Sequence, residues 1–107
     1  MNLKFNHGES TVPGTLIMEV CAAQWSVPVA VVYWRWSYDH QIEILYINVV
    51  EQLRRKGIAT RAILELRNCY PHTGIVTMGG TKLGKEWMRR TGWQKDEQRN
   101  CWFITAA

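Results

Sequence analysis

The sequence predicts an α+β domain in which a mixed, mainly antiparallel sheet carries two main helices. Short apolar runs rich in β-branched and aromatic residues are typical of strands. Two later segments carry helical patterns and alternate with the last strands, which indicates a crossover connection. With 107 residues, the chain is long enough for a single domain, residues 1–107.

The first half of the chain is predicted to form an antiparallel meander. Residues 1–14 show little periodicity, so we expect a loosely structured lead-in with a short strand at residues 3–5. The next three runs are interpreted as strands, and a polar turn at residues 37–40 separates the last two. They cover residues 15–22, 27–36 and 41–50.

The second half alternates helices with strands. From residue 58 the apolar positions follow a helical stripe, and Pro71 ends it because the residue before a proline avoids helical geometry. A short strand at residues 74–78 follows, then a helix at residues 82–91 that ends at Gly92. The last predicted strand covers residues 100–105.

The loop between the third strand and the first helix predicts an anion site. Such a loop leaves unpaired backbone N–H groups at the helix N-terminus, and here it carries Arg54, Arg55 and Lys56 beside Gly57. The plain alternative is a solvated basic loop. The net charge of +4 and a pI near 9.2 suit an anionic partner without choosing one.

The segment INVVEQLRRKGIA, residues 47–59, resembles motif A of the GCN5-related N-acetyltransferases. The pyrophosphate loop of that family reads (Arg or Gln)-x-x-Gly-x-(Gly or Ala), and Arg54, Gly57 and Ala59 fill its fixed positions. Val49 stands where the family has its strand-ending valine. The resemblance implies a truncated acyl-CoA N-acyltransferase fold and acetyl-CoA (coenzyme A) as cofactor.

The resemblance also implies which residues hold the cofactor. The backbone of Ile47 and Val49 would pair with the pantetheine arm, and the Val49 N–H would face the thioester oxygen. The pyrophosphate would be held by backbone N–H groups of residues 55–60 and by three basic side chains. The residues implied around the pyrophosphate are Arg54, Arg55, Lys56, Gly57, Ile58, Ala59 and Thr60.

Residues 81–93 resemble the closing motif of the same family, roughly Asn-x-x-Ala-x-x-x-Tyr-x-x-x-Gly-Phe. Thr81, Gly84, Met88 and the pair Gly92 and Trp93 stand at its fixed positions. Met88 replaces a tyrosine that often protonates the departing sulfur, and a thioether cannot donate a proton. Tyr33, Tyr46 or water remain as donors. The usual N-terminal helices are missing, so the acceptor site is open, completed by a second subunit, or lost.

Glu43 is the candidate general base. It lies inside the third strand, where histone-acetylating members of the family carry a catalytic glutamate. A carboxylate between apolar strand neighbours is partly desolvated, which suits proton abstraction. The alternative is an exposed glutamate without a chemical role.

These observations predict an N-acetyltransferase that moves an acetyl group from acetyl-CoA to a primary amine of a small molecule or protein by direct transfer. One alternative is a weak or inactive protein that only binds coenzyme A. A small basic nucleic-acid binder is disfavoured, because it leaves the apolar flanks of the loop unexplained. A near match to a nucleotidase phosphate loop at residues 79–86 is also disfavoured, since Glu86 replaces the hydroxyl that binds magnesium.

Composition adds expectations about surroundings and partners. Three widely spaced cysteines argue against a disulfide framework, and Cys69 with His72 cannot make a metal site alone, so no metal is expected. The sequence shows no signal peptide and no membrane-spanning run, which favours a cytoplasmic protein without a membrane partner. Six tryptophans in a short chain favour a homodimer.

Overall fold

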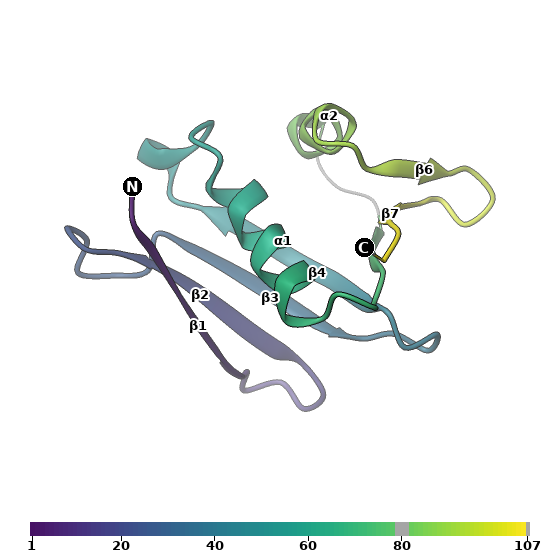
Figure 1. Ribbon diagram of the computed structural model, residues 1–107, viewed down its shortest axis with the longest axis horizontal. Helices are drawn as coiled ribbons and strands as arrows, with labels where there is room; N and C mark the ends of the chain where they lie inside the picture. The colour runs from purple at the N-terminus through teal and green to yellow at the C-terminus, as the bar shows by residue number, and fades with distance from the viewer. Residues whose placement is uncertain (79–81, 107) are drawn as a thin grey trace.

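The computed structural model describes residues 1–78 and 82–106, apart from the side chains of Lys82 and Leu83. Within these residues the chain forms one sheet with the strand order β1-β2-β3-β4-β5-β7-β6 (Figure 1). The elements are β1 (Leu3–Glu9), β2 (Leu16–Ala22), β3 (Ala30–Trp36), β4 (Ile42–Val49), η1 (Glu51–Leu53), α1 (Ile58–Cys69), β5 (Ile75–Met78), α2 (Lys82–Arg90), β6 (Gln94–Asp96) and β7 (Cys101–Ile104).

The pairing of the strands confirms the predicted fold class. Strands β1 to β4 pair antiparallel in chain order, so the predicted meander is present. Strand β5 pairs parallel to β4 after the α1 crossover, and β7 pairs antiparallel with both β5 and β6. The sheet is therefore mixed and mainly antiparallel, with two main helices.

The short strand expected at residues 3–5 is present, but it continues to residue 9, so the prediction of a loose lead-in was wrong for residues 6–9. Strand β1 pairs with β2 along its whole length, from Leu3 opposite Ala22 to Glu9 opposite Leu16. The side chains of Leu3 and Phe5 pack against the core. The sequence hides this strand because Asn, His and Gly have low strand propensity, so pairing with a neighbour decides the conformation.

Two smaller boundaries also differ from prediction. Strand β3 begins at Ala30, later than expected, although Val29 already donates its N–H to the Val20 carbonyl over 2.7 Å. Strand β6 was not predicted, because its residues, QKD, include no apolar side chain. It forms by pairing with β7 at one edge of the sheet.

Both helices cover the same face of the sheet. The buried side chains of α1 include Ile58, Ala62 and Leu66, and they share one core with Met88 of α2. The strand residues in that core alternate along the chain, as Ile42 and Ile44 do, so they point to one side. Among the described residues, neither helix covers the opposite face.

The end of α2 follows the predicted glycine signal. Gly92 has a φ of 90°, and the Trp93 N–H donates to the Met88 carbonyl over 2.9 Å, which is the bonding of a Schellman motif. Trp93 is buried, and the centroid of its ring lies 6.0 Å from the ring centroid of Trp87. No helix in the described part of the chain is long and apolar enough to cross a membrane.

Candidate functional site

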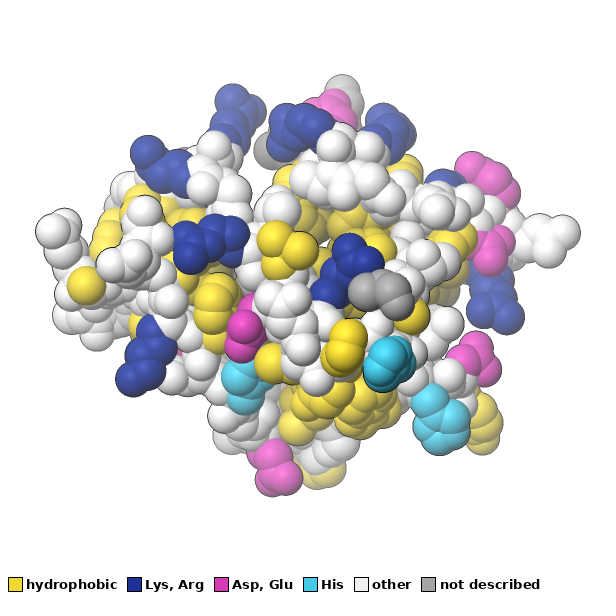
Figure 2. All heavy atoms as spheres, in the orientation of Figure 1, with side chains coloured by type: hydrophobic (Ala, Val, Ile, Leu, Met, Phe, Trp, Pro, Cys, Tyr) yellow, Lys and Arg dark blue, Asp and Glu magenta, His cyan; other side chains and the backbone are white. Residues whose placement is uncertain are grey.

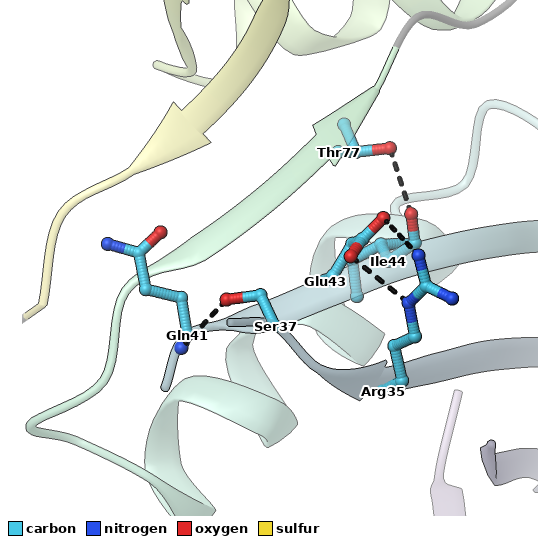
Figure 3. A network of polar contacts seen from close by, with 6 residues as sticks. All are labelled: Arg35, Ser37, Gln41, Glu43, Ile44 and Thr77. Atoms are coloured by element: carbon cyan, nitrogen blue, oxygen red, sulfur yellow. Dashed lines mark hydrogen bonds and ion pairs between the residues drawn. The ribbon is translucent and has the colours of Figure 1, made fainter. Parts of the chain in front are cut away.

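The site begins where β4 and β5 stop pairing. Their parallel register covers Ile42 to Ile44 on β4 and ends with Ile44 opposite Thr77. At that last pair, the Thr77 hydroxyl donates to the Ile44 carbonyl over 3.1 Å (Figure 3). Beyond it, the second half of β4 has no strand partner on the β5 side among the described residues.

A β-bulge in β4 determines which backbone groups face this open edge. Tyr46 lies opposite Tyr33, but Ile44 lies opposite Trp34, so Leu45 is an extra residue on β4. The Ile42 N–H points towards β5, where it donates to the Gly74 carbonyl over 2.9 Å.

Past the bulge, the alternation of N–H directions along β4 is reversed. The Val50 N–H donates to the Val29 carbonyl over 2.9 Å, on the β3 side. Because successive strand residues direct their N–H groups to opposite sides, Val49 and Ile47 direct theirs to the open edge. Their side chains remain packed against the core.

Arg54 folds back over the end of β4. Its Nε donates to the Val49 carbonyl over 3.0 Å, and Nη2 donates to Asn48 Oδ1 over 3.3 Å. Because the N–H and carbonyl of a strand residue face the same side, Arg54 bonds the Val49 carbonyl on the same open edge that the Val49 N–H faces. The side chain of Arg54, which was predicted to bind a phosphate, is therefore already used in these two contacts.

The loop before α1 has the geometry of an anion site. Arg55 and Gly57 both adopt left-handed backbone conformations, with φ values of 66° and 79°. Gly57 is the N-cap of α1, and no side chain among the described residues caps the helix. The first helical bond runs from the Arg61 N–H to the Gly57 carbonyl, over 3.0 Å. The N–H groups of residues 58–60 thus have no carbonyl partner within the helix.

Side chains around the loop divide into exposed cations and buried supports. Arg55 and Lys56 are exposed, and Figure 2 shows Lys and Arg side chains over this loop and over α2. Ile58 is buried, so it offers only its backbone. The hydroxyl of Thr60 accepts a hydrogen bond from Trp87 Nε1 over 3.0 Å, which holds α2 beside the loop.

Glu43 lies on the sheet face away from the helices, next to the point where β4 and β5 separate. Its carboxylate is paired with Arg35, whose Nε and Nη2 lie 3.1 and 3.3 Å from Oε1 and Oε2 (Figure 3). The side chain of Glu43 is 17% exposed and that of Arg35 is 52% exposed. The pair holds the carboxylate in one orientation at the edge of solvent.

The candidate proton donors, and the methionine that replaces the family's tyrosine, lie on different faces of the sheet. Met88 is buried in the core, as expected for a methionine. Tyr33 and Tyr46 are register partners on the face of Glu43, with ring centroids 6.1 Å apart. A shallow hollow of about 250 Å³ lies beside them, lined by Glu19, Tyr33 and Asn48 among others.

A larger hollow lies at the other end of the strands. Its volume is about 580 Å³, and its lining includes Asp39, His72, Asp96 and Arg99. None of the predicted site residues lines it. Thr81, the first position of the closing motif, and residues 79–81 of the segment that resembles a nucleotidase loop lie outside the described residues.

Sequence reasoning missed Arg35. The signal was available in principle, because Arg35 and Glu43 flank the predicted turn at residues 37–40. In the structure the Ser37 N–H donates to the Gln41 carbonyl over 2.8 Å across that turn. This pairing sets Arg35 opposite Glu43. One residue of register error would have placed Arg35 on the opposite face.

Comparison with known proteins shows the fold. No protein-family model matches the sequence, and no curated protein matches it. Among the solved structures that resemble it is a protein designated a streptothricin acetyltransferase from Bacillus anthracis, crystallised in complex with acetyl coenzyme A. The two share 12% sequence identity with a TM-score of 0.67. The match covers 91% of this chain and 65% of that one, so this chain spans about two thirds of the length of its structural neighbour. The chain has the acyl-CoA N-acyltransferase fold of the GCN5-related N-acetyltransferases, as the resemblance implied.

Proposed function

We propose that the protein is an acetyl-CoA-dependent N-acetyltransferase that moves the acetyl group directly to a primary amine. One observation carries the proposal: among the described residues β4 has no β5 partner after Ile44, and after η1 and the basic loop the chain reaches a helix N-terminus without a side-chain cap. An unpaired strand edge that is followed along the chain by an anion site suits a ligand that has an amide-containing arm and a diphosphate. Acetyl-CoA is such a ligand, and it supplies the acetyl group as a thioester.

The donor end of the site is built from backbone. The N–H groups of Ile47 and Val49 would bond the pantetheine arm as an added strand. Arg54 already donates to the Val49 carbonyl, and the Val49 N–H would stabilise charge on the thioester oxygen. The N–H groups of residues 58–60, with the Arg55 and Lys56 side chains, would hold the pyrophosphate.

The acceptor end uses the uncovered face of the sheet. Glu43 stands there beside the separation of β4 and β5, and we assign it the removal of a proton from the amine, directly or through water. The departing thiolate takes its proton from Tyr33, Tyr46 or water, because Met88 is buried and has no proton to give. An uncovered face leaves room for an amine on a small molecule or on a protein.

A second candidate function is cofactor binding without useful turnover. The observation that favours it is Met88, which replaces the family's tyrosine and lies in the core. Under this alternative the protein would hold coenzyme A and act through an interaction. The distinction depends on the chemical step alone, so binding experiments cannot make it.

The experiment that tests the proposed activity follows release of the coenzyme A thiol from acetyl-CoA in the presence of an amine panel. The panel includes polyamines, a lysine-containing peptide and streptothricin, the last because of the name of the structural neighbour. We expect thiol release above the amine-free rate with at least one amine, together with an acetylated product by mass spectrometry. Tight acetyl-CoA binding without product from any amine would support the second candidate.

A further inference from the structure

A compact group of three metal-binding side chains lies on the β1 side of α1, away from the predicted cofactor residues. His7 comes from β1, and Glu65 and Cys69 come from α1. His7 Nε2 lies 2.9 Å from Glu65 Oε2 and 3.9 Å from Cys69 Sγ. Cys69 Sγ lies 3.6 Å from the same carboxylate oxygen.

The fold brings these residues together for simple reasons. Glu65 and Cys69 are four residues apart on α1, so they lie on one side of the helix. On β1, Leu3, Phe5 and His7 alternate towards the face that α1 covers, and the first two pack against the core. Arg61 Nη1 donates to the Met1 carbonyl over 2.7 Å, so a second contact holds the beginning of the chain against this helix.

We propose that His7, Glu65 and Cys69 bind one Zn²⁺ ion, with the fourth position open to solvent. Zn²⁺ binds sulfur at about 2.3 Å and nitrogen or oxygen at about 2.0 Å, which at tetrahedral angles separates the ligand atoms by roughly 3.3 to 3.6 Å. The three separations here are 2.9, 3.6 and 3.9 Å. Shifts of about 0.4 Å would therefore bring all three atoms to zinc-binding positions.

The ligand types select this metal. A thiolate, an imidazole and a carboxylate together suit a borderline ion such as Zn²⁺, whereas Ca²⁺ and Mg²⁺ prefer oxygen ligands throughout. The side chains of His7 and Glu65 are 36% and 26% exposed, and Cys69 is exposed, so an ion can enter from solvent. When Zn²⁺ binds, the Cys69 thiol releases its proton to solvent and the sulfur binds as thiolate.

The same residues fit a nucleophilic triad poorly. In such a triad the carboxylate orients one imidazole nitrogen and the other nitrogen receives the proton. Here Glu65 and Cys69 both approach Nε2 of His7. Although the residue is exposed, partial desolvation of its sulfur, with the Glu65 carboxylate adding to it, also raises the pKa of the Cys69 thiol, which opposes nucleophilic activation.

The zinc site would fasten the first strand to α1 without touching the cofactor loop. Glu65 and Cys69 lie roughly 10 and 16 Å along the helix axis from Ile58, at about 1.5 Å per residue. The proposal is thus independent of acetyl-CoA binding. Its failure would leave the proposed transferase activity untouched.

The test is a Co²⁺ titration of the full chain, prepared with chelator and then freed of it, followed by Zn²⁺ competition. We expect one Co²⁺ per chain, with a sulfur-to-cobalt charge-transfer band and tetrahedral ligand-field bands, both abolished by one equivalent of Zn²⁺. Cys69→Ser should remove the charge-transfer band, and His7→Gln should weaken Zn²⁺ binding by more than about 100-fold, the upper range for losing even an outer partner of a metal ligand. Cys21→Ser and His72→Gln are the matched controls and should bind as the wild type does.

Three results of the Co²⁺ titration would overturn the proposal. They are absence of the charge-transfer band in the wild type, its persistence in Cys69→Ser, and its loss in Cys21→Ser. Thermal denaturation shows whether metal-free His7→Gln is folded. A folded His7→Gln that binds Zn²⁺ as tightly as the wild type would also contradict the proposal.

Discussion

At the scale of single residues, the ion pair between Arg35 and Glu43 defines the acceptor side of the proposed site. The guanidinium contacts both carboxylate oxygens, so it fixes the direction in which Glu43 faces. A base held in this way is oriented before the amine arrives. Arg35 is therefore a positioning residue in our proposal, and Glu43 is the residue that takes the proton.

We predict that Glu43→Gln lowers kcat/KM for acetyl transfer by about 10² to 10⁴-fold, the usual contribution of a general base. The affinity for acetyl-CoA should not change, because the proposed donor contacts lie on the other half of β4. Steady-state kinetics and calorimetry measure the two quantities separately. Glu19→Gln is the control, since Glu19 is a half-buried carboxylate on the same sheet face. Equal rates for wild type and Glu43→Gln would refute the assignment.

A second residue-scale prediction concerns Cys69. Partial desolvation of the sulfur raises the pKa of its thiol above the ordinary value, and the Glu65 carboxylate raises this pKa further by its charge and as a hydrogen-bond acceptor. A raised pKa keeps the thiol protonated to higher pH, so alkylation of Cys69 in metal-free protein should accelerate only at more alkaline pH than for a free thiol. Mass spectrometry of iodoacetamide-treated protein across pH measures the midpoint. Glu65→Gln should move it to lower pH, and an unchanged midpoint would show that the Glu65 carboxylate does not raise this pKa.

At the scale of elements, β4 works as two half-strands joined by a bulge. Its first half pairs with β3 and β5, and its second half pairs with β3 alone among the described residues. The extra residue, Leu45, turns the Ile47 and Val49 N–H groups towards the open edge. No glycine or other bulge signal marks this place, because the run ILYI reads as an uninterrupted strand.

The other elements differ in how far the sequence could predict them. The strand, loop and helix from Ile42 to Cys69 were predictable, because periodicity changes sharply at the loop and Pro71 follows the helix. The second half of β1, residues 6–9, and strand β6 were not, since both are edge segments whose residues have weak strand propensity. Their conformation comes from pairing with β2 and β7, which no local pattern records.

Gly57 gives the sharpest test of the loop. A Cβ added there would meet no atom within 4 Å, so its φ of 79° and any added charge, rather than crowding, decide the effect of substitution. Asn and Asp tolerate this left-handed conformation equally and have nearly the same shape. We predict that Gly57→Asp weakens acetyl-CoA binding by about tenfold or more relative to Gly57→Asn, because a carboxylate a few Å from a diphosphate adds on the order of 1 kcal/mol or more of repulsion. Calorimetric Kd values that agree between the two variants would contradict a phosphate site at this loop.

At the scale of the whole molecule, the helices and the candidate acceptor residues lie on opposite faces of one sheet. The core face carries α1 and α2, and the opposite face carries Glu43, Tyr33 and Tyr46. The end of the β4–β5 pairing lies between these two sets of residues, and in our proposal a ligand on the β4 edge reaches Glu43 there. Apart from β6 and the second half of β1, the order of strands and helices was predictable from patterning, and the same fold persists at 12% identity to its structural neighbour. The faces to which individual polar residues turn depend on register, which the sequence leaves open.

The most direct test of the central claim is a titration of ¹⁵N-labelled protein with acetyl-CoA, followed by amide chemical shifts. We predict saturable shifts of the Ile47 and Val49 amides and of the amides at Gly57, Ile58, Ala59 and Thr60. The amide chemical shifts of His72, Asp96 and Arg99, which line the larger hollow at the other end of the strands, should not change. Absence of saturable shifts at millimolar acetyl-CoA, or shifts centred on that hollow, would contradict the proposed cofactor site.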